Sequence, residues 1–294
     1  MSDSTVAIRK LKGGMVGMGM IFDETYRPFF ENAYQKGIYD PRTGVIKLEI
    51  AAVASRTGGR AARYKDAAGN QINDFASYIE PDSIGQLLNH DVDFVCVATP
   101  DDRHYEATMA AIDAGKHVMI EKPSVLSMQQ LDSIIAAARD KQVLCKVVYH
   151  KLFDPDHKKM RTLVADNVLQ HINTGYCTLL EPKQISGSQF AEWIQGRNPG
   201  TYVAVHYIKL IDFTFGGKLK SVSCSGQRGI VGEANGHTWD STQLRLVYEY
   251  ESGREAAFDI HTLSLIHISE PTRLLSVGDA GVCVKKKRGG GGGG

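Results

Sequence analysis

Five short apolar runs alternate with helix-like segments in the first half of the chain, and this alternation restricts the fold more than any other feature. The runs are rich in β-branched residues and show little of the polar alternation of a strand with one exposed face. Strands that are buried on both faces occur in parallel sheets covered by helices. The runs span 11–16, 46–54, 94–99, 118–120 and 143–149. The pattern predicts a doubly wound α/β domain over residues 1–149.

The second half has a different texture. Leu244, Leu246, Tyr248 and Tyr250 occupy alternate positions, and 219–224 alternate less regularly. Such a period of two is typical of a sheet with one packed face and one more polar face. We therefore predict a second α+β domain with an open, largely antiparallel sheet over residues 150–262.

Residues 263–294 do not read like a folded segment. "LSLIHISEPTR" resembles the conceptual translation of a transposon-end sequencing adapter, and the lysine run and six glycines that follow resemble homopolymer base calls. We expect this stretch to be a non-native tail and the natural sequence to be cut off near Thr262, which leaves the second sheet incomplete. The alternative is a genuine basic, flexible tail.

Composition excludes several classes of protein. The formal net charge is +1, which argues against nucleic acid as the main partner. No apolar run approaches the length of a membrane span, and the first residues lack the apolar core of a secretory signal. The cysteines are scattered singly, without the spacing of a metal site or a disulfide framework. We therefore expect a cytoplasmic protein with reduced thiols and no bound metal. The cysteines are Cys96, Cys145, Cys177, Cys224 and Cys283.

A glycine turn follows the first apolar run. Gly17 and Gly19 form a GxG pair, which lets the backbone approach a pyrophosphate at the positive end of the next helix. The third glycine of the GxGxxG pattern of Rossmann dinucleotide-binding domains would fall at Phe22, so the match is incomplete. An ordinary tight turn is the alternative.

The second run ends in residues that suit a phosphate. An NAD site usually has an acidic residue here for the ribose 2′-hydroxyl, whereas this chain has Ser55 and Arg56. A guanidinium pairs well with a 2′-phosphate, so we predict NADP in preference to NAD. The interval from Gly17 to Arg56 is longer than usual, and we attribute the excess to an insertion around residues 34–45. The alternative is that Arg56 is simply a solvated loop residue.

Three segments together resemble the Gfo/Idh/MocA family of glucose–fructose oxidoreductase and inositol 2-dehydrogenase. They are "GMVGMGMIF" (14–22), "ATPDDRHYEATMAAIDAGKHVMIEKP" (98–123) and "HYIKLIDFTFG" (206–216). The resemblance implies a Rossmann domain followed by an α/β domain with an open sheet. It implies an NAD(P)-dependent oxidoreductase that acts on a hydroxyl of a sugar, cyclitol or related small molecule. It also implies homo-oligomers formed through the open sheet, which a truncated chain puts in doubt.

The resemblance also assigns roles to residues of the "EKP" motif. It implies that Lys122 holds the substrate hydroxyl and shuttles its proton, that Glu121 contacts the nicotinamide ribose, and that Pro123 fixes the turn. A surface ion pair of Glu121 with Lys122 is the alternative. The full set of expected cofactor-binding residues is Gly17, Gly19, Ser55, Arg56, Thr99, Pro100, His104, Glu121 and Lys122.

His206 is the second expected catalytic residue, because it and Gly216 have the spacing of the family pattern. The family's flanking acidic residues fall on Tyr202 and Lys209, so the pattern is altered. Asp212 lies one helical turn from Lys209 and is expected to pair with it. The segment then reads either as a rewired proton relay on one helix face or as a structural helix. These departures keep open a second reading, a dinucleotide-binding regulator or partner protein without turnover.

Overall fold

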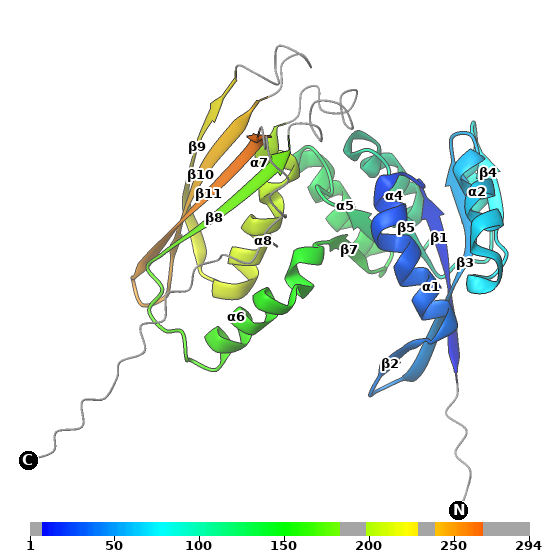
Figure 1. Ribbon diagram of the computed structural model, residues 1–294, viewed down its shortest axis with the longest axis horizontal. Coiled ribbons are helices and arrows are strands. Elements are labelled where there is room, and N and C mark those ends of the chain that lie inside the picture. Colours follow the sequence, from blue (N-terminus) through cyan, green and yellow to red (C-terminus); the bar gives the residue numbers. More distant parts are fainter. Residues whose placement is uncertain (1–7, 183–197, 229–238, 267–294) are drawn as a thin grey trace, which may run out of the picture. The chain divides into compact units, whose positions relative to one another are not determined.

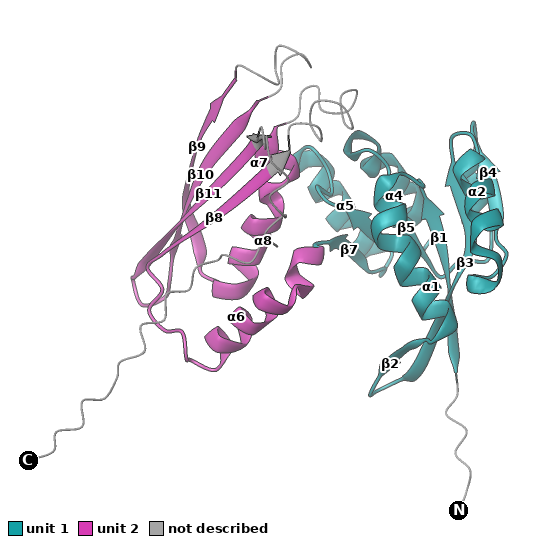
Figure 2. Ribbon diagram, viewed as in Figure 1, with its two compact units in different colours: residues 1–149 teal, residues 150–294 magenta. Residues whose placement is uncertain are grey.

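The computed structural model describes residues 8–182, 198–228 and 239–266. The chain divides into two compact units, residues 1–149 and 150–294 (Figure 2). Most of the expected tail lies outside the described residues, which end at Ile266. The strand that reaches Ile266 continues its pairing beyond Thr262, since Leu263 lies opposite Leu180.

The first unit is built on a parallel sheet in which the strand order reverses once. Its strands run β4-β3-β1-β5-β6-β7, all parallel to their neighbours (Figure 1). Strands β1, β3 and β4 follow one another toward one edge of the sheet, and β5, β6 and β7 follow one another toward the other edge. This is the doubly wound arrangement. The strands are β1 (Arg9–Val16), β3 (Gly44–Ser55), β4 (Ala76–Ile79), β5 (Phe94–Val97), β6 (His117–Glu121) and β7 (Cys145–Val148).

Helices cover both faces of this sheet, which explains the continuous apolar runs. Met15 packs in a cluster with residues of α1 and α2, whereas the next residue, Val16, packs in a cluster with residues of α3, α4 and α5. Successive side chains of a strand point to opposite faces, so both faces must be apolar. The predicted α/β class is confirmed. The helices are α1 (Arg27–Gln35), α2 (Gly59–Ala68), α3 (Ser83–Leu88), α4 (His104–Asp113) and α5 (Met128–Asp140), with short turns η2 (Gly69–Gln71) and η3 (Asp101–Arg103).

The segment expected to be an insertion forms a β-hairpin. Strand β2 (Ile38–Asp40) pairs antiparallel with the first residues of β3, with Tyr39 opposite Val45. The Asp40 carboxylate accepts a hydrogen bond from the backbone N–H of Arg42 at 2.8 Å and closes the turn. The hairpin lengthens β3 at its amino end, away from Ser55 and Arg56, so the extra residues do not alter the end of the strand.

Two helices begin at residues whose side chains cap the first turn. The Ser127 side chain accepts a hydrogen bond from the Gln130 backbone N–H at 3.2 Å and begins α5. The Gln130 side chain accepts from the Leu126 N–H rather than from the Ser127 N–H, so only half of a capping box forms. Asp154 caps α6 (Pro155–Ala165) by accepting from the Asp156 N–H at 3.0 Å.

The second unit packs helices on one face of a four-stranded sheet. The order is β8-β11-β10-β9, with β8 parallel to β11 and the other pairs antiparallel (Figure 1). Tyr207, Leu210 and Ile211 of α8 pack against Leu246 of β10 and Phe258 of β11. The predicted open, largely antiparallel sheet is confirmed. The elements are η4 (His150–Phe153), α6, β8 (Thr174–Pro182), α7 (Pro199–Tyr202), α8 (Ala204–Phe215), β9 (Lys218–Gln227), β10 (Ser241–Glu249) and β11 (Glu255–Ile266).

The predicted alternation in β10 holds in part. Leu246 and Tyr248 are buried on the helix side and Leu244 is partly buried, but Tyr250 follows the strand and donates its N–H to the Arg254 carbonyl in the turn. In the edge strand β9, Val222 remains 54% exposed. Across the described residues, no helix is long and apolar enough to cross a membrane.

Candidate cofactor and active site

The glycine turn lies where the strand order of the first sheet reverses, between β1 and β5. Gly17 has φ +92°, and a Cβ added to it would lie 2.5 Å from the Ala98 carbonyl oxygen. Its N–H donates to the Ala54 carbonyl at the end of β3, at 2.9 Å. A Cβ on Gly19, by contrast, would meet nothing within 4 Å. The turn is therefore held tightly at Gly17 and faces open space at Gly19, as a site for a pyrophosphate requires.

Phe22, which stands where the motif has its third glycine, is accommodated by a local change of helix type. Residues Phe22–Tyr26 form a π-helical turn, η1, which continues directly into α1. The Phe22 ring is buried and meets the Tyr64 ring edge to face, with centroids 5.2 Å apart. The glycine that normally permits close packing is thus replaced by a ring that fills the core.

Ser55 and Arg56 lie where β3 ends, as the sequence places them. The Ser55 hydroxyl accepts a hydrogen bond from the Gly58 N–H at 3.1 Å and so shapes the turn into α2. Arg56 is exposed. Nearby, Arg60 pairs with Asp23 of η1 at 3.3 Å, so an acidic side chain beside the glycine turn is neutralised. A phosphate contact of Arg56 stays a prediction.

Thr99 follows β5 beside the glycine turn. A Cβ on Gly17 would lie 3.2 Å from its Cγ2, which shows how closely the two segments approach. The Thr99 hydroxyl is buried and has no hydrogen-bond partner within the described part of the chain. An unsatisfied buried hydroxyl beside an open glycine turn fits the binding of a polar group there. Pro100 is exposed and follows it.

His104 ties two loops together. Its ring is 1% exposed, and its Nε2 and Nδ1 lie 2.8 Å from the carbonyl oxygens of Thr99 and Pro123. Each ring nitrogen thus has a backbone carbonyl within hydrogen-bond distance. His104 therefore joins the loop after β5 to the loop after β6. A direct contact of its side chain with a cofactor stays a prediction.

Glu121 ends β6 as a buried carboxylate. It is 5% exposed, its Oε1 accepts a hydrogen bond from the Tyr26 hydroxyl at 2.9 Å, and its Oε2 accepts from the Lys122 N–H at 3.3 Å. Burial raises the pKa of Glu121, although the Tyr26 hydrogen bond and the charges of Lys122 and His104 oppose the rise. Glu121 is thus not a surface residue, while Lys122 is half-buried and is joined to Pro123 by a cis peptide bond.

His206 lies on the buried side of α8 in the second unit. It is 5% exposed, and its ring centroid is 4.4 Å from that of His150 in η4. Lys209 and Asp212 form the expected i,i+3 pair at 2.9 Å, but both are partly exposed. The three residues therefore do not share one environment. The contact of His206 with His150 lacks a local sequence signal, because the two residues come from separate elements.

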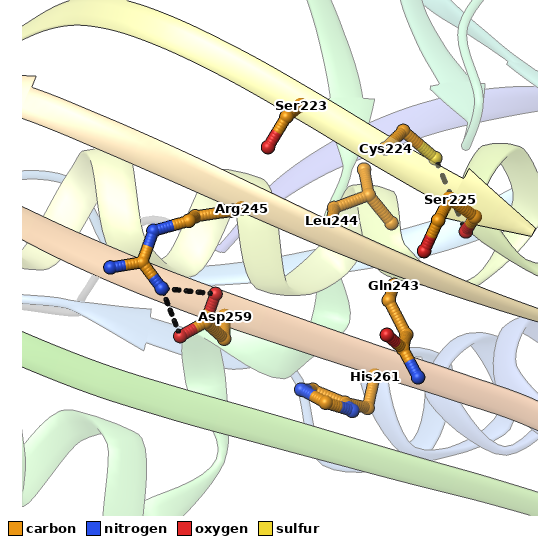
Figure 3. A pocket seen from close by; sticks show the side chains of 8 residues that line it. All are labelled: Ser223, Cys224, Ser225, Gln243, Leu244, Arg245, Asp259 and His261. Atoms are coloured by element: carbon orange, nitrogen blue, oxygen red, sulfur yellow. Dashed lines mark hydrogen bonds and ion pairs between the residues drawn. The ribbon is translucent and has the colours of Figure 1, made fainter.

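A hollow lies on the sheet of the second unit, and none of the candidate site residues described above lines it. Its volume is about 440 Å³. Two rows of polar residues on neighbouring strands line it: Gln243 lies opposite Ser225 and His261, and Arg245 lies opposite Ser223 and Asp259 (Figure 3). Arg245 donates to both oxygens of Asp259 on the neighbouring strand, so its charge is already satisfied. The hollow is lined by Ser223, Cys224, Ser225, Gln243, Leu244, Arg245, Asp259 and His261.

A family comparison decides what the first unit is. Residues 11–149 match the model of the oxidoreductase family with an NAD-binding Rossmann fold, Gfo/Idh/MocA. These residues belong to the Gfo/Idh/MocA family. The match covers the glycine turn, the end of β3, the loop after β5 and the "EKP" motif.

Curated relatives match this chain over part of their length. Scyllo-inositol 2-dehydrogenase (NADP(+)) of Bacillus subtilis is 34% identical over 106 residues, which are 36% of this chain and 27% of that protein. 1,5-anhydro-D-fructose reductase of Ensifer adhaerens is 33% identical over 118 residues, 40% of this chain and 34% of that protein. D-glucoside 3-dehydrogenase of Escherichia coli is 25% identical over 215 residues, which are 72% of this chain and 56% of that protein. In each case the match spans less than two thirds of the relative.

Solved structures share the fold of both units. A putative myo-inositol dehydrogenase from Sinorhizobium meliloti has a TM-score of 0.66 at 19% identity, covering 86% of this chain and 69% of that one. The WlbA dehydrogenase from Bordetella pertussis, in complex with NADH and UDP-GlcNAcA, has a TM-score of 0.68 at 17% identity. The match covers 88% of this chain and 68% of that one. At this identity the likeness shows the fold alone.

The contrast between the two glycines predicts different effects of one substitution. Gly17→Ala should lower the free energy of unfolding by about 1–3 kcal/mol or more, because it forces a Cβ at positive φ against the Ala98 carbonyl. Gly19→Ala should change it by less than about 1 kcal/mol, since its Cβ enters open space. Urea unfolding of both variants measures this. Equal destabilisation would contradict the geometry.

The burial of Glu121 predicts a pH-dependent cost. A carboxyl whose pKa is raised on folding makes the protein lose stability as pH rises above the unfolded-state value of about 4.3. Glu121→Gln lacks this loss. The unfolding temperature of the variant minus that of the wild type should therefore increase from pH 4 to pH 8. Glu106→Gln, at an exposed position of α4, is the control and should show no such trend. A difference that shrinks with pH would refute the assignment.

Proposed function

We propose that this chain is an NAD(P)-dependent oxidoreductase that transfers a hydride between the nicotinamide and a hydroxyl-bearing carbon of a sugar, cyclitol or related small molecule. One observation carries the proposal. The glycine turn, open at Gly19, lies at the strand-order reversal of the unit whose β6 ends at Glu121, which Lys122 follows. Open parallel sheets bind ligands at the carboxyl ends of their strands, at such a reversal. The names of the relatives, dehydrogenases and reductases of inositol, anhydrofructose and glucoside, support the substrate class.

The residues around the turn fit a dinucleotide. The backbone at Gly17 and Gly19 and the first turn of the following helix would hold the pyrophosphate, and the Thr99 hydroxyl would gain the partner that it lacks. Arg56 is the proposed partner of a 2′-phosphate, so we propose NADP in preference to NAD. Two relatives carry NADP(+) in their names, whereas a solved relative was crystallised with NADH. When bound, the nicotinamide supplies the hydride acceptor or donor.

Lys122 is the proposed proton carrier. When the substrate carbon loses a hydride, its hydroxyl loses a proton, and the Lys122 amine would take it and become ammonium. The reverse reaction returns that proton to the new hydroxyl. Glu121 is the proposed contact of the nicotinamide ribose, and its carboxyl oxygens accept hydrogen bonds from the Tyr26 hydroxyl and the Lys122 N–H.

His206 is a second proposed proton-transfer residue. It is buried in α8 against His150, and an imidazole exchanges protons near neutral pH. Lys209 is paired with Asp212, so it does not replace the family's acidic residue as a partner that orients the ring. We therefore propose that His150 contributes to orienting His206, and that Lys209 and Asp212 stabilise the helix.

The cofactor preference predicts a ranking of affinities. In fluorescence titrations, NADPH should bind more tightly than NADH, and Arg56→Asp should weaken NADPH binding about tenfold or more while leaving NADH nearly unchanged. Arg63→Asp, the same charge change at another exposed arginine of this region, is the control. Tighter binding of NADH would refute the role of Arg56. Binding of neither, by a sample shown to be folded, would refute the dinucleotide site.

The proposed proton transfer predicts loss of turnover without loss of binding. On a panel of polyols and sugars with NADP, Lys122→Ala and His206→Ala should each lower kcat about 10²–10⁴-fold, with the NADPH dissociation constant changed only a few-fold. Lys141→Ala, at an exposed position after α5, should behave like the wild type. Wild-type binding of NADPH with no turnover on any member of the panel would instead favour the regulator without catalysis.

A further inference from the structure

The π-helical turn after the glycine loop brings a tyrosine to the end of β6. Residues Phe22–Tyr26 form this turn, and Tyr26 is buried in the same apolar cluster as Phe22. The Tyr26 hydroxyl lies 2.9 Å from Oε1 of Glu121, a residue 95 positions later in the sequence. A buried hydrogen bond thus joins the helix of the glycine turn to the "EKP" motif.

We propose that Tyr26 is a positioning residue for Glu121: its hydroxyl donates the hydrogen bond that fixes the Glu121 carboxylate at the carboxyl end of β6. The inference deepens the proposed function, because it rests on Glu121 facing the nicotinamide ribose. It assigns Tyr26 no contact with the cofactor or the substrate. Its action is through Glu121.

The helix type explains why Tyr26 reaches this position. A π turn holds one residue more than an α turn, so it rotates the side chains that follow by roughly one residue's step, about 100°. Such single π turns occur frequently at functional sites. Here the turn begins at Phe22, the position at which the glycine motif is broken. The departure from the motif and the hydrogen bond to Glu121 therefore belong to one structural change.

The direction of the hydrogen bond follows from burial. Burial raises the pKa of the Tyr26 hydroxyl well above its ordinary value, so Tyr26 remains a donor at any physiological pH. The Glu121 carboxylate is therefore the acceptor. The charge-assisted bond that results is stronger than a bond between neutral groups.

Groups from several parts of the first unit act on the ionisation of Glu121. The Tyr26 hydroxyl of η1 and the charges of Lys122 and of His104 favour its ionised form, whereas burial disfavours it. Cys96 of β5 faces it as a neutral thiol, since burial raises the pKa of Cys96 to about 12. Tyr26 has the largest effect of the groups that oppose the desolvation. Removing its hydroxyl should therefore raise the pKa of Glu121.

A direct measurement tests this without any enzyme activity. The full chain, labelled with glutamate that carries ¹³C at the side-chain carboxyl, is titrated by NMR, and the Glu121 signal is assigned by its loss in Glu121→Gln. Tyr26→Phe keeps the ring and should move the Glu121 titration to higher pH. Tyr64→Phe, the same change at another tyrosine of this cluster, should leave it in place. An unchanged Glu121 titration in folded Tyr26→Phe overturns the proposal.

Cofactor binding provides a second readout. Tyr26→Phe should weaken NADPH binding about threefold to tenfold, and it should add little when Glu121 is already Gln, because the two residues act as one unit. Additive effects of the two substitutions would overturn the proposal, since Tyr26 would then act elsewhere. If the wild type binds neither NADPH nor NADH, the proposed function fails, and the NMR titration still decides whether Tyr26 positions Glu121.

Discussion

The close approach of Gly17 to the Ala98 carbonyl fixes the glycine turn beside the end of β5, and the other loops of the site connect to that end. Only a residue without a Cβ can lie so close to the end of β5. From that end, His104 spans to the loop after β6 through the carbonyls of Thr99 and Pro123. The glycine turn is thus held by backbone contacts, and the His104 side chain joins the loops after β5 and β6 through their carbonyls.

Burial of titratable groups is the second common feature of this region. Glu121 is a buried carboxyl group, and the buried His104 ring has a carbonyl oxygen 2.8 Å from each of its nitrogens. Burying such a group costs free energy unless it is hydrogen-bonded. Proteins retain such groups where function uses them. The hydrogen bonds that satisfy both groups are supplied within the first unit.

The sequence predicted most of the fold because its signals are local. β-branched runs indicated the parallel sheet, and the i,i+3 spacing of Lys209 and Asp212 indicated their ion pair. The π turn, the bond of Tyr26 to Glu121 and the contact of His206 with His150 were not predicted. Each depends on residues that only tertiary packing brings together, and no periodicity records it.

The β2–β3 hairpin provides a position for attaching a label to this protein. Its turn, at Pro41 and Arg42, is exposed and lies at the amino end of β3, whereas Ser55 and Arg56 lie at the opposite end of the same strand. A strand of this length separates the two ends by roughly 35 Å. A fluorophore or affinity peptide placed in the turn would therefore report on the first unit while leaving the glycine turn undisturbed. The same separation makes the turn a point where chain length can vary freely.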